Sequence, residues 1–283
     1  RVVSILANEL CEKPNVNVYT ISLFNNGKKN HYEIDEKVVQ KHLFENPTNM
    51  KRAMLKGGSV KLRKIIRENN IDILIACGAL YYPIVVSSVI GLKTKTICWE
   101  HSNAMNDKDH SFQQFSRWVG AKYAHCVVTL TKHDQKMYIE KYKNSRVKQI
   151  YNPTDENIFR HAKEYDPELK KIVSVGRFSY QKNFELLVEI AREVLKKHPD
   201  WVWEIYGDGE SKDNVQTMIN NYNLNDKLLL KGSVNNLYEL YSRYSFLVMT
   251  SRYEGFPMSL LEGLSSGLPL ISFDVLTGPR EII

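Results

Sequence analysis

The sequence predicts a doubly wound α/β protein made of two units. Short apolar runs rich in Val, Ile and Leu alternate with segments of helical period along the chain. These runs are apolar throughout, as in parallel strands that are covered on both faces. A polar stretch with two prolines, residues 151–170, interrupts the alternation and divides it into two series.

The first series contains five predicted strands and four predicted helices. The strands cover residues 16–24, 71–77, 94–99, 124–130 and 147–150. The helices cover residues 59–69, 81–91, 110–122 and 132–143. Because short strands alternate with helices, we expect parallel pairing.

The second series repeats this alternation. Its strands cover residues 171–176, 201–206, 227–231, 245–250 and 269–273. Its helices cover residues 183–197, 211–222, 235–243 and 258–266. We therefore expect an N-terminal unit over 1–152, a linker over 153–170 and a C-terminal unit over 171–283. The chain opens within a helical pattern and closes on GPREII, a helix start, so we expect the protein to extend beyond both ends.

The composition argues against several classes of protein. Hydrophobic residues make up 43% of the 283 residues, enough for a buried core. No apolar run approaches the ~18–20 residues that cross a bilayer, and the first residues lack a signal-peptide pattern. The cysteines form no CxxC pair and no metal-ligand spacing with histidine, which indicates reduced thiols in a cytoplasmic protein. They are Cys11, Cys77, Cys98 and Cys126.

Charge is divided unevenly along the chain, whose net charge is +7. Residues 1–150 hold 24 Lys and Arg against 13 Asp and Glu, a net charge of +11. Residues 151–283 hold 15 against 19, a net charge of −4. The basic half could face nucleic acid, a membrane or an anionic substrate. It carries no recognisable nucleic-acid-reading motif, so we expect no nucleic-acid partner.

The most basic stretch is residues 51–67, KRAMLKGGSVKLRKIIR. It holds seven Lys and Arg and no acid, with apolar residues between them. One interpretation is a solvated basic helix with one apolar face in the core. The other is an element that docks on an anionic membrane surface.

Three successive strands of the second series end in glycine, at Gly176, Gly207 and Gly232. Glycine there lets the backbone approach a ligand, and open α/β sheets bind ligands at that edge. Arg177 and Lys182 follow the first of these strands and would place two cations at the edge, which suits a diphosphate. Solvated loop charges are the alternative.

The most informative segment is TSRYEGFPMSLLE, residues 250–262. Gly255, Phe256 and Pro257 lead into a predicted helix, whose first N–H groups attract anions. Glu254 stands at that helix start, and Glu262 lies about two turns further along. Carboxylates accept hydrogen bonds from sugar hydroxyls. Alternatively, Glu254 only interacts with the dipole at the helix start, and Glu262 only lies on a solvated helix face.

These motifs together resemble glycosyltransferase family four. The similarity is strongest over 171–283 and looser over 1–150. It includes Gly207-Asp208-Gly209, Gly267-Leu268-Pro269 and Gly278-Pro279…Glu281 beside the residues above. The resemblance implies the GT-B fold, two Rossmann-like domains with a cleft between them. It also implies a retaining, metal-independent enzyme without a cofactor.

The resemblance also assigns roles to individual residues. Arg177 and Lys182 would bind the donor diphosphate, and Glu254 would contact the donor sugar. The backbone of residues 255–257 would bind sugar and phosphate, and Glu262 would hold the ribose. The main chain of Ser233 and Val234 would meet the base. Gly207 lies at the same edge of the sheet and would take part in donor binding.

His101 is the candidate from the first unit. It follows the predicted strand 94–99, and it resembles the family's histidine that contacts the transferred sugar. A lone histidine without a catalytic role is the alternative.

The resemblance also implies the substrates. The expected donor is a UDP-sugar, and the expected acceptor is a saccharide that is lipid-linked in bacterial surface-polysaccharide synthesis. Enzymes of this kind bind the inner face of the membrane through a basic first domain, which would suit 51–67.

Two other functions remain compatible with these residues. A sugar-nucleotide 2-epimerase of the same fold would show the same two halves and nucleotide site. A non-catalytic glycosyltransferase-like subunit would keep the fold but tends to lose donor residues, whereas Arg177, Lys182, Glu254 and Glu262 are all present.

Overall fold

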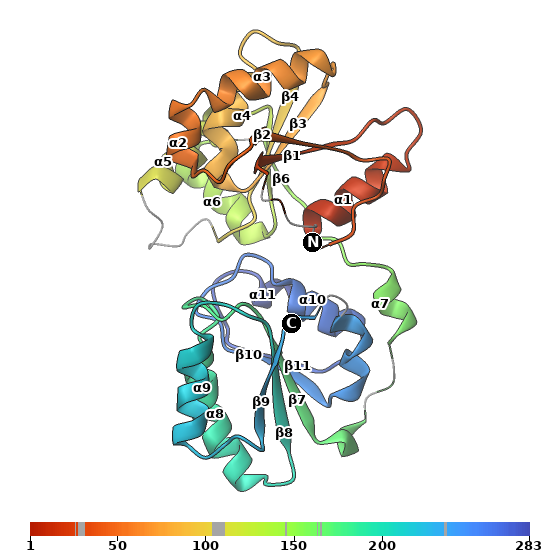
Figure 1. Ribbon diagram of the computed structural model, residues 1–283, viewed down its shortest axis with the longest axis vertical. Helices are drawn as coiled ribbons and strands as arrows, with labels where there is room; N and C mark the ends of the chain where they lie inside the picture. The colour runs from red at the N-terminus through yellow and green to blue at the C-terminus, as the bar shows by residue number, and fades with distance from the viewer. Residues whose placement is uncertain are drawn as a thin grey trace. The chain divides into compact units, whose positions relative to one another are not determined.

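Every strand pair that the structure describes is parallel, as the uniformly apolar runs predict. The computed structural model describes residues 1–25, 27, 32–103, 111–144, 146–162, 164, 166–234 and 237–283. Its chain divides into two units, Arg1–Pro153 and Thr154–Ile283 (Figure 1). Residues 154–162, within the predicted linker, belong to the second unit.

The first unit holds two parallel sheets. Strands β1 (Tyr19–Phe24) and β2 (Val39–Phe44) form a pair. A four-stranded sheet follows in the order β3 (Ile73–Cys77), β4 (Lys95–Trp99), β5 (Cys126–Thr129) and β6 (Val147–Gln149). The helices are α1 (Val2–Cys11), α2 (Met50–Leu55), α3 (Gly58–Glu68), α4 (Tyr82–Ser88), α5 (Ser111–Tyr123) and α6 (Lys132–Tyr142), with a 3-10 turn at Ala79–Tyr81.

One core joins the strands and helices α2 to α6. Leu62 and Ile66 of α3 and Tyr82 of α4 are buried against the sheet. The ring of Tyr82 packs on Gly120 of α5, where an added Cβ would lie 2.4 Å from a ring carbon. Because glycine has no side chain, α4 and α5 can approach closely at this position.

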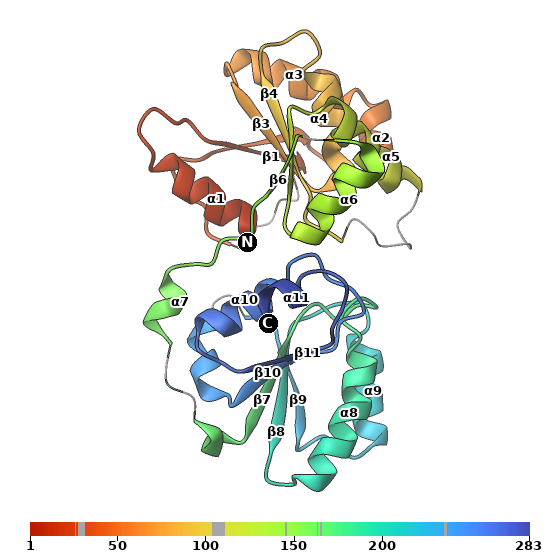
Figure 2. The same cartoon turned by 180° about the vertical axis from the view of Figure 1, so that it is seen from behind.

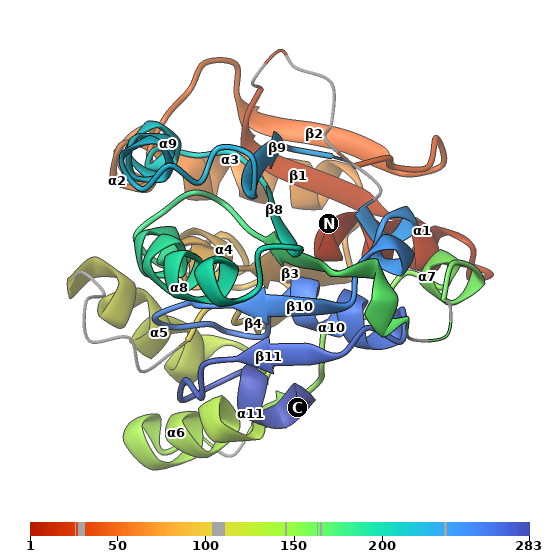
Figure 3. The same cartoon turned by 90° about the horizontal axis from the view of Figure 1, so that it is seen from below.

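The second unit is a five-stranded parallel sheet. Its order is β11 (Leu270–Ser272), β10 (Phe246–Met249), β7 (Lys171–Val175), β8 (Val202–Tyr206) and β9 (Leu228–Gly232), as Figure 3 shows. The helices are α7 (Asn157–Arg160), α8 (Phe184–Lys197), α9 (Lys212–Asn221), α10 (Met258–Ser265) and α11 (Pro279–Ile282). Short 3-10 turns lie at Pro167–Leu169, Leu237–Glu239 and Tyr241–Arg243.

Alternate residues of these strands face two separate cores. Ile172 and Trp203 point to the core that α8 and α9 cover. Val173 and Leu247 point to the other, which contains Leu260 of α10. Figures 1 and 2 show α8 and α9 on one side of the sheet and α10 on the other. Because both faces are covered, these strands carry apolar residues on both faces.

The prediction of an α-helix over 235–243 is wrong. Residues 235 and 236 lie outside the described residues, as does residue 110 of another predicted helix. The remainder forms two 3-10 turns instead. Tyr238, Tyr241 and Tyr244 are all buried at a spacing of three residues, which matches the 3-10 period.

Three elements have no counterpart in the predictions. Strand β2, VQKHLF, has three polar residues in a row and, among the described strands, pairs with β1 alone, so it lacks the apolar signature of a central strand. Helix α2 has six residues, too few for a clear period. Helix α7 has four, but its Ile158 is fully buried in the second unit.

Candidate functional site

The candidate site lies where the second sheet reverses its strand order. The chain places β7, β8 and β9 in succession and then returns to add β10 on the other side of β7. Open α/β sheets bind ligands at such a reversal, outside the carboxyl ends of the strands. Lys182 follows β7 and Glu254 follows β10. The Nζ of Lys182 lies 2.7 Å from Oε1 of Glu254, and these side chains are only 16% and 6% exposed.

Glycines at the strand ends make room for this ion pair. The stem of Lys182 lies against Gly176, where an added Cβ would be 2.9 Å from the lysine Cδ. Gly207 has a φ of +143°, and an added Cβ there would lie 1.8 Å from the carbonyl oxygen of Gly176. The Gly207 N–H donates to the carbonyl of Gly232 at 2.9 Å. The three glycine strand ends therefore form one continuous edge.

Two residues that the sequence pattern does not predict hold Glu254 in place. The Nε2 of Gln181 donates to Oε2 of Glu254 at 3.3 Å and to the carbonyl of Tyr253 at 3.0 Å. The Thr277 hydroxyl donates to the Glu254 carbonyl. Lys182 and Gln181 thus occupy different oxygens of one carboxylate, whose orientation is fixed before any ligand binds.

The loop 254–257 leads directly into α10. Pro257 is the N-cap residue of this helix and makes no side-chain hydrogen bond to the first turn. Gly278, at a φ of +81°, packs against the loop: an added Cβ would lie 2.7 Å from the carbonyl oxygen of Gly255. Glu254, Gly255, Phe256 and Pro257 are all buried. A helix start beside the Lys182 ammonium has the charge that suits a phosphate group.

Glu262 lies in the second turn of α10 and is 4% exposed. This burial excludes the solvated-face interpretation. The Tyr241 hydroxyl donates to its Oε2 at 3.4 Å. The tyrosine comes from the 3-10 turn that replaces the predicted helix, so the sequence pattern did not place it here.

The remaining predicted donor residues lie at the rim of the same edge. Arg177 follows β7 but is 75% exposed, and its Nη2 lies 3.2 Å from Oε2 of Glu210 rather than against Glu254. Exposed ion pairs contribute little, so a stronger anion can replace Glu210. Ser233 and Val234 follow β9 and are exposed.

In the first unit, His101 follows the carboxyl end of β4. Its ring lies against Trp99, with the ring centroids 4.6 Å apart. Its Nε2 is buried and has no hydrogen-bond partner within the described part of the chain. Burial lowers the pKa of His101, although the nearby Glu100 carboxylate partly offsets this effect. The ring is therefore neutral at pH 7. A neutral ring with an unsatisfied nitrogen can bond to a hydroxyl.

A buried cluster fixes the backbone on both sides of His101. Glu100 and Arg117 are each about 1% exposed, and Nε of Arg117 lies 2.8 Å from Oε2 of Glu100. The Tyr138 hydroxyl donates to the same Oε2 at 2.9 Å, and the Ser102 hydroxyl donates to Oε1 at 2.7 Å. A buried charge of this kind is stable only when it is fully bonded. The cluster therefore restrains residues 100 and 102, which flank His101.

One group of side chains could contact a cation. Among the described residues, ligand atoms of Cys11, Glu12 and Asp35 lie within 4.8 Å of one another. Glu12 already pairs with Lys37 at 2.5 Å. None of the three belongs to the predicted site, and exposed acidic groups of this kind are common without a metal ion.

Comparison with known proteins agrees with the fold. The sequence model of Glycosyltransferase Family 4 matches residues 1–158. The model of Glycosyl transferases group 1 matches residues 155–283. The second match contains every predicted donor residue of the second unit.

Curated relatives match the whole length of this chain. The chain is 29% identical to the amylovoran biosynthesis glycosyltransferase AmsD of Erwinia amylovora, and spans 79% of that protein. It is 25% identical to a Campylobacter jejuni N-acetyl-D-galactosaminyltransferase whose named acceptor is a glycan on PP-undecaprenol, and spans 77% of it.

A solved structure shares the fold. The Anabaena HepE complex with UDP-glucose matches 87% of this chain at a TM-score of 0.72 and 15% identity, and this chain covers 70% of HepE. The α/β GT-B fold predicted from the sequence is thereby confirmed.

Proposed function

This chain belongs to glycosyltransferase family 4, and from that premise we propose that it transfers a sugar from a UDP-sugar to a saccharide acceptor. The sugar is a hexose or an N-acetylhexosamine, the anomeric configuration is retained, and no metal ion takes part. The observation that carries this proposal is the Lys182–Glu254 pair at the strand reversal, beside the uncapped start of α10.

The residues of the second unit divide the donor between them. Lys182, Arg177 and the backbone of 255–257 bind the diphosphate and stabilise the charge that develops on it as the sugar leaves. Glu254 accepts from hydroxyls of the transferred sugar. Glu262 holds the ribose, and Ser233 and Val234 meet the base through their main chain. The leaving phosphate oxygen takes the proton of the acceptor, so no protein side chain acts as the general base.

A donor screen tests this function. UDP-sugars are expected to raise the melting temperature of the protein more than GDP- or ADP-sugars at equal concentration. UDP should then be released only when a saccharide acceptor is present. Stabilisation by GDP- or ADP-sugars alone would contradict the choice of nucleotide. UDP release without an acceptor would favour a 2-epimerase, and no donor binding would favour a non-catalytic subunit.

We assign to His101 a hydrogen bond to a hydroxyl of the transferred sugar. His101→Ala is expected to lower transfer about 100-fold, because the bond strengthens as positive charge develops on the sugar. Since its pKa is lowered, wild-type activity should persist below the ordinary histidine pKa of about 6.5. The measurement is the rate of UDP release against pH, with circular dichroism to check folding. The exposed His198→Ala is the control, and equal rates in both variants would remove His101 from the mechanism.

The acceptor is proposed to be a lipid-linked glycan in bacterial surface-polysaccharide synthesis, reached at the inner face of the membrane. Within the described residues, no helix is long and apolar enough to cross a bilayer. Segment 51–67 supports surface docking. Its Leu62 and Ile66 lie in the core, whereas Leu55 and Val60 are 88% and 71% exposed among the lysines and arginines. Exposed apolar residues with a basic surround suit the interface of an anionic membrane.

This docking is tested by vesicle flotation. The protein should float with vesicles containing phosphatidylglycerol but not with pure phosphatidylcholine, and less so in high salt. Leu55→Ser/Val60→Ser should reduce the bound fraction at least threefold, because both apolar side chains leave the interface. Ile271→Ser, which changes a 53% exposed apolar residue of β11, is the matched control. Binding that is independent of lipid charge and of both variants would refute the role of this segment.

A further inference from the structure

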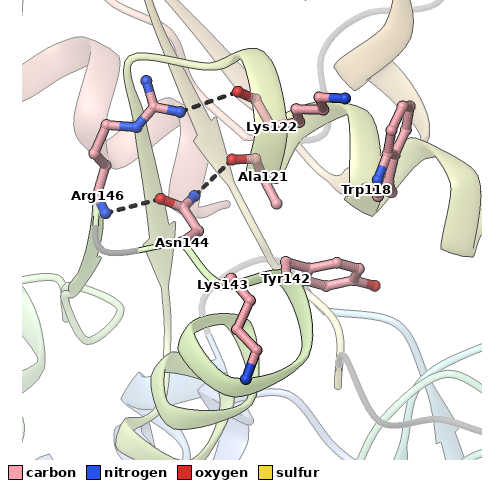
Figure 4. A pocket seen from close by; sticks show the side chains of 7 residues that line it. All are labelled: Trp118, Ala121, Lys122, Tyr142, Lys143, Asn144 and Arg146. Carbon is pink, nitrogen blue, oxygen red and sulfur yellow. Dashed lines mark hydrogen bonds between the residues drawn. The ribbon is translucent and has the colours of Figure 1, made fainter.

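A pocket in the first unit is lined by none of the residues assigned to the donor site. Helices α5 and α6 end shortly before β5 and β6 begin, so the pocket lies near the amino ends of those strands. His101 lies at the carboxyl end of β4, the opposite edge of the same parallel sheet. The pocket has a volume of about 370 Å³, the size of a small-ligand site. Its lining includes Trp118, Lys122, Tyr142, Lys143, Asn144 and Arg146 (Figure 4).

Hydrogen bonds fix the walls of this pocket. The Asn144 amide donates to the carbonyl of Ala121 at 2.8 Å, and its Oδ1 accepts from the Arg146 N–H at 2.8 Å. The Arg146 guanidinium donates to the carbonyl of Lys122 at 3.0 Å. Figure 4 shows that two of these bonds tie the turn after α6 to the end of α5, while the bond between Arg146 and Asn144 lies within the turn. Hydrogen bonds therefore hold a wall that contains the buried Ala121 and Asn144, while the lining residues Trp118, Lys122, Lys143 and Arg146 are exposed.

The lining is cationic. It includes Lys122, Lys143 and Arg146 and no carboxylate. The positive electrostatic field of these residues extends beyond the pocket. Burial lowers the pKa of the nearby His125, and the charges of Lys95 and Arg146 lower it further. Such a concentration of positive charge selects an anionic ligand.

Aromatic rings border the same hollow. Trp118 is 42% exposed, and the Nζ of Lys122 lies 4.9 Å from the centroid of its ring. Phe115 stacks on Trp118 with centroids 6.1 Å apart, and Tyr123 meets it edge-on at 5.9 Å. Figure 4 shows the rings of Trp118 and Tyr142 on one side of the pocket and Asn144 and Arg146 on the other. Exposed rings present flat apolar surface, which suits the C–H face of a sugar.

We propose that this pocket binds an acidic sugar unit of the saccharide acceptor. The sugar ring packs against Trp118 and Tyr142, and its carboxylate or phosphate pairs with Lys122, Lys143 or Arg146. The inference rests on the proposed transfer to a saccharide. The pocket is concave and pinned by hydrogen bonds, which favours a single sugar unit over a flat membrane surface. Because it lies at the edge of the sheet opposite His101, it would hold a part of the acceptor remote from the transferred sugar.

Calorimetry with trigalacturonate and the neutral maltotriose tests this proposal. Trigalacturonate should bind at low salt and weaken as salt rises, whereas maltotriose should bind at least about tenfold more weakly. Lys122→Gln/Lys143→Gln and Trp118→Ala should each weaken trigalacturonate about tenfold or more. Lys136→Gln, an exposed lysine of α6 outside the pocket, should change nothing. UDP binding should be equal in all these proteins, so a failure here is distinct from a failure of the donor site.

Three results would overturn the proposal. One is equal affinity for the acidic and the neutral trisaccharide. A second is unchanged trigalacturonate binding in both pocket variants. The third is binding of phosphatidylglycerol vesicles that the pocket variants abolish, with no binding of trigalacturonate, which would identify a membrane contact instead. Inorganic phosphate, added as a competitor, should displace trigalacturonate only at much higher concentration, because it lacks the sugar ring.

Discussion

Glu254→Gln is expected to lower the rate of sugar transfer by at least about 100-fold while the protein stays folded. Glutamine keeps the shape of the side chain but removes the charge that holds the Lys182 ammonium at 2.7 Å. The variant also loses the stronger acceptor for hydroxyls of the donor sugar. The measurement is the rate of UDP release with a UDP-sugar and an acceptor, together with donor affinity by calorimetry.

The matched control is Glu193→Gln, which changes a 59% exposed glutamate of α8 that pairs with Arg192. Its transfer rate should stay within about twofold of the wild type, since exposed pairs contribute little. Comparing kcat with donor affinity shows where the lost interaction acts. A fall in kcat with unchanged donor affinity means that Glu254 acts mainly in the transition state. A folded Glu254→Gln variant with the wild-type rate would contradict the assigned role.

The positions of Lys182 and Glu254 could be predicted because each follows a strand end. In a parallel sheet, the carboxyl ends of all strands lie on one edge, so residues 72 positions apart in the chain become neighbours. The same argument predicted His101 beyond the end of β4. A periodic pattern is therefore enough to bring chemical groups to one edge of a sheet.

The supporting residues could not be predicted in this way. Arg117 lies on a helix whose pattern gives no reason to bury it, and only the fold shows Glu100 and Tyr138 around it. Gln181 acts through two hydrogen bonds and Thr277 through one, all of them between loops. Such bonds depend on the exact path of the backbone, which has no signature in hydrophobic period or motif.

Arg177 shows the limit of a motif argument. Its place after β7 is as predicted, yet its guanidinium pairs with Glu210 at the surface. A strand end fixes where the backbone of a residue lies but not where a long, exposed side chain points. Its contact with the diphosphate therefore stays a prediction.

Gly207→Ala is expected to destabilise the second unit by about 3 kcal/mol or more and to abolish donor binding. The φ of +143° is unfavourable for alanine, and its Cβ would lie 1.8 Å from the Gly176 carbonyl oxygen. Since that contact is with backbone, only a separation of the ends of β7 and β8 relieves it. For a unit of this size, the melting temperature should fall by roughly 10 °C, measured by calorimetry.

Gly232→Ala separates steric overlap from the effect of a left-handed backbone. Gly232 has a φ of +73°, but an added Cβ would meet no atom within 4 Å. Alanine there should cost only about 1 kcal/mol, the ordinary penalty for a left-handed residue. Gly207→Ala should also lose UDP binding below its own melting temperature, because Gly176 supports the stem of Lys182 and must move with its strand end. Equal stability of the two variants, or intact UDP binding in Gly207→Ala, would show that the close approach of β7 and β8 does not shape the donor site.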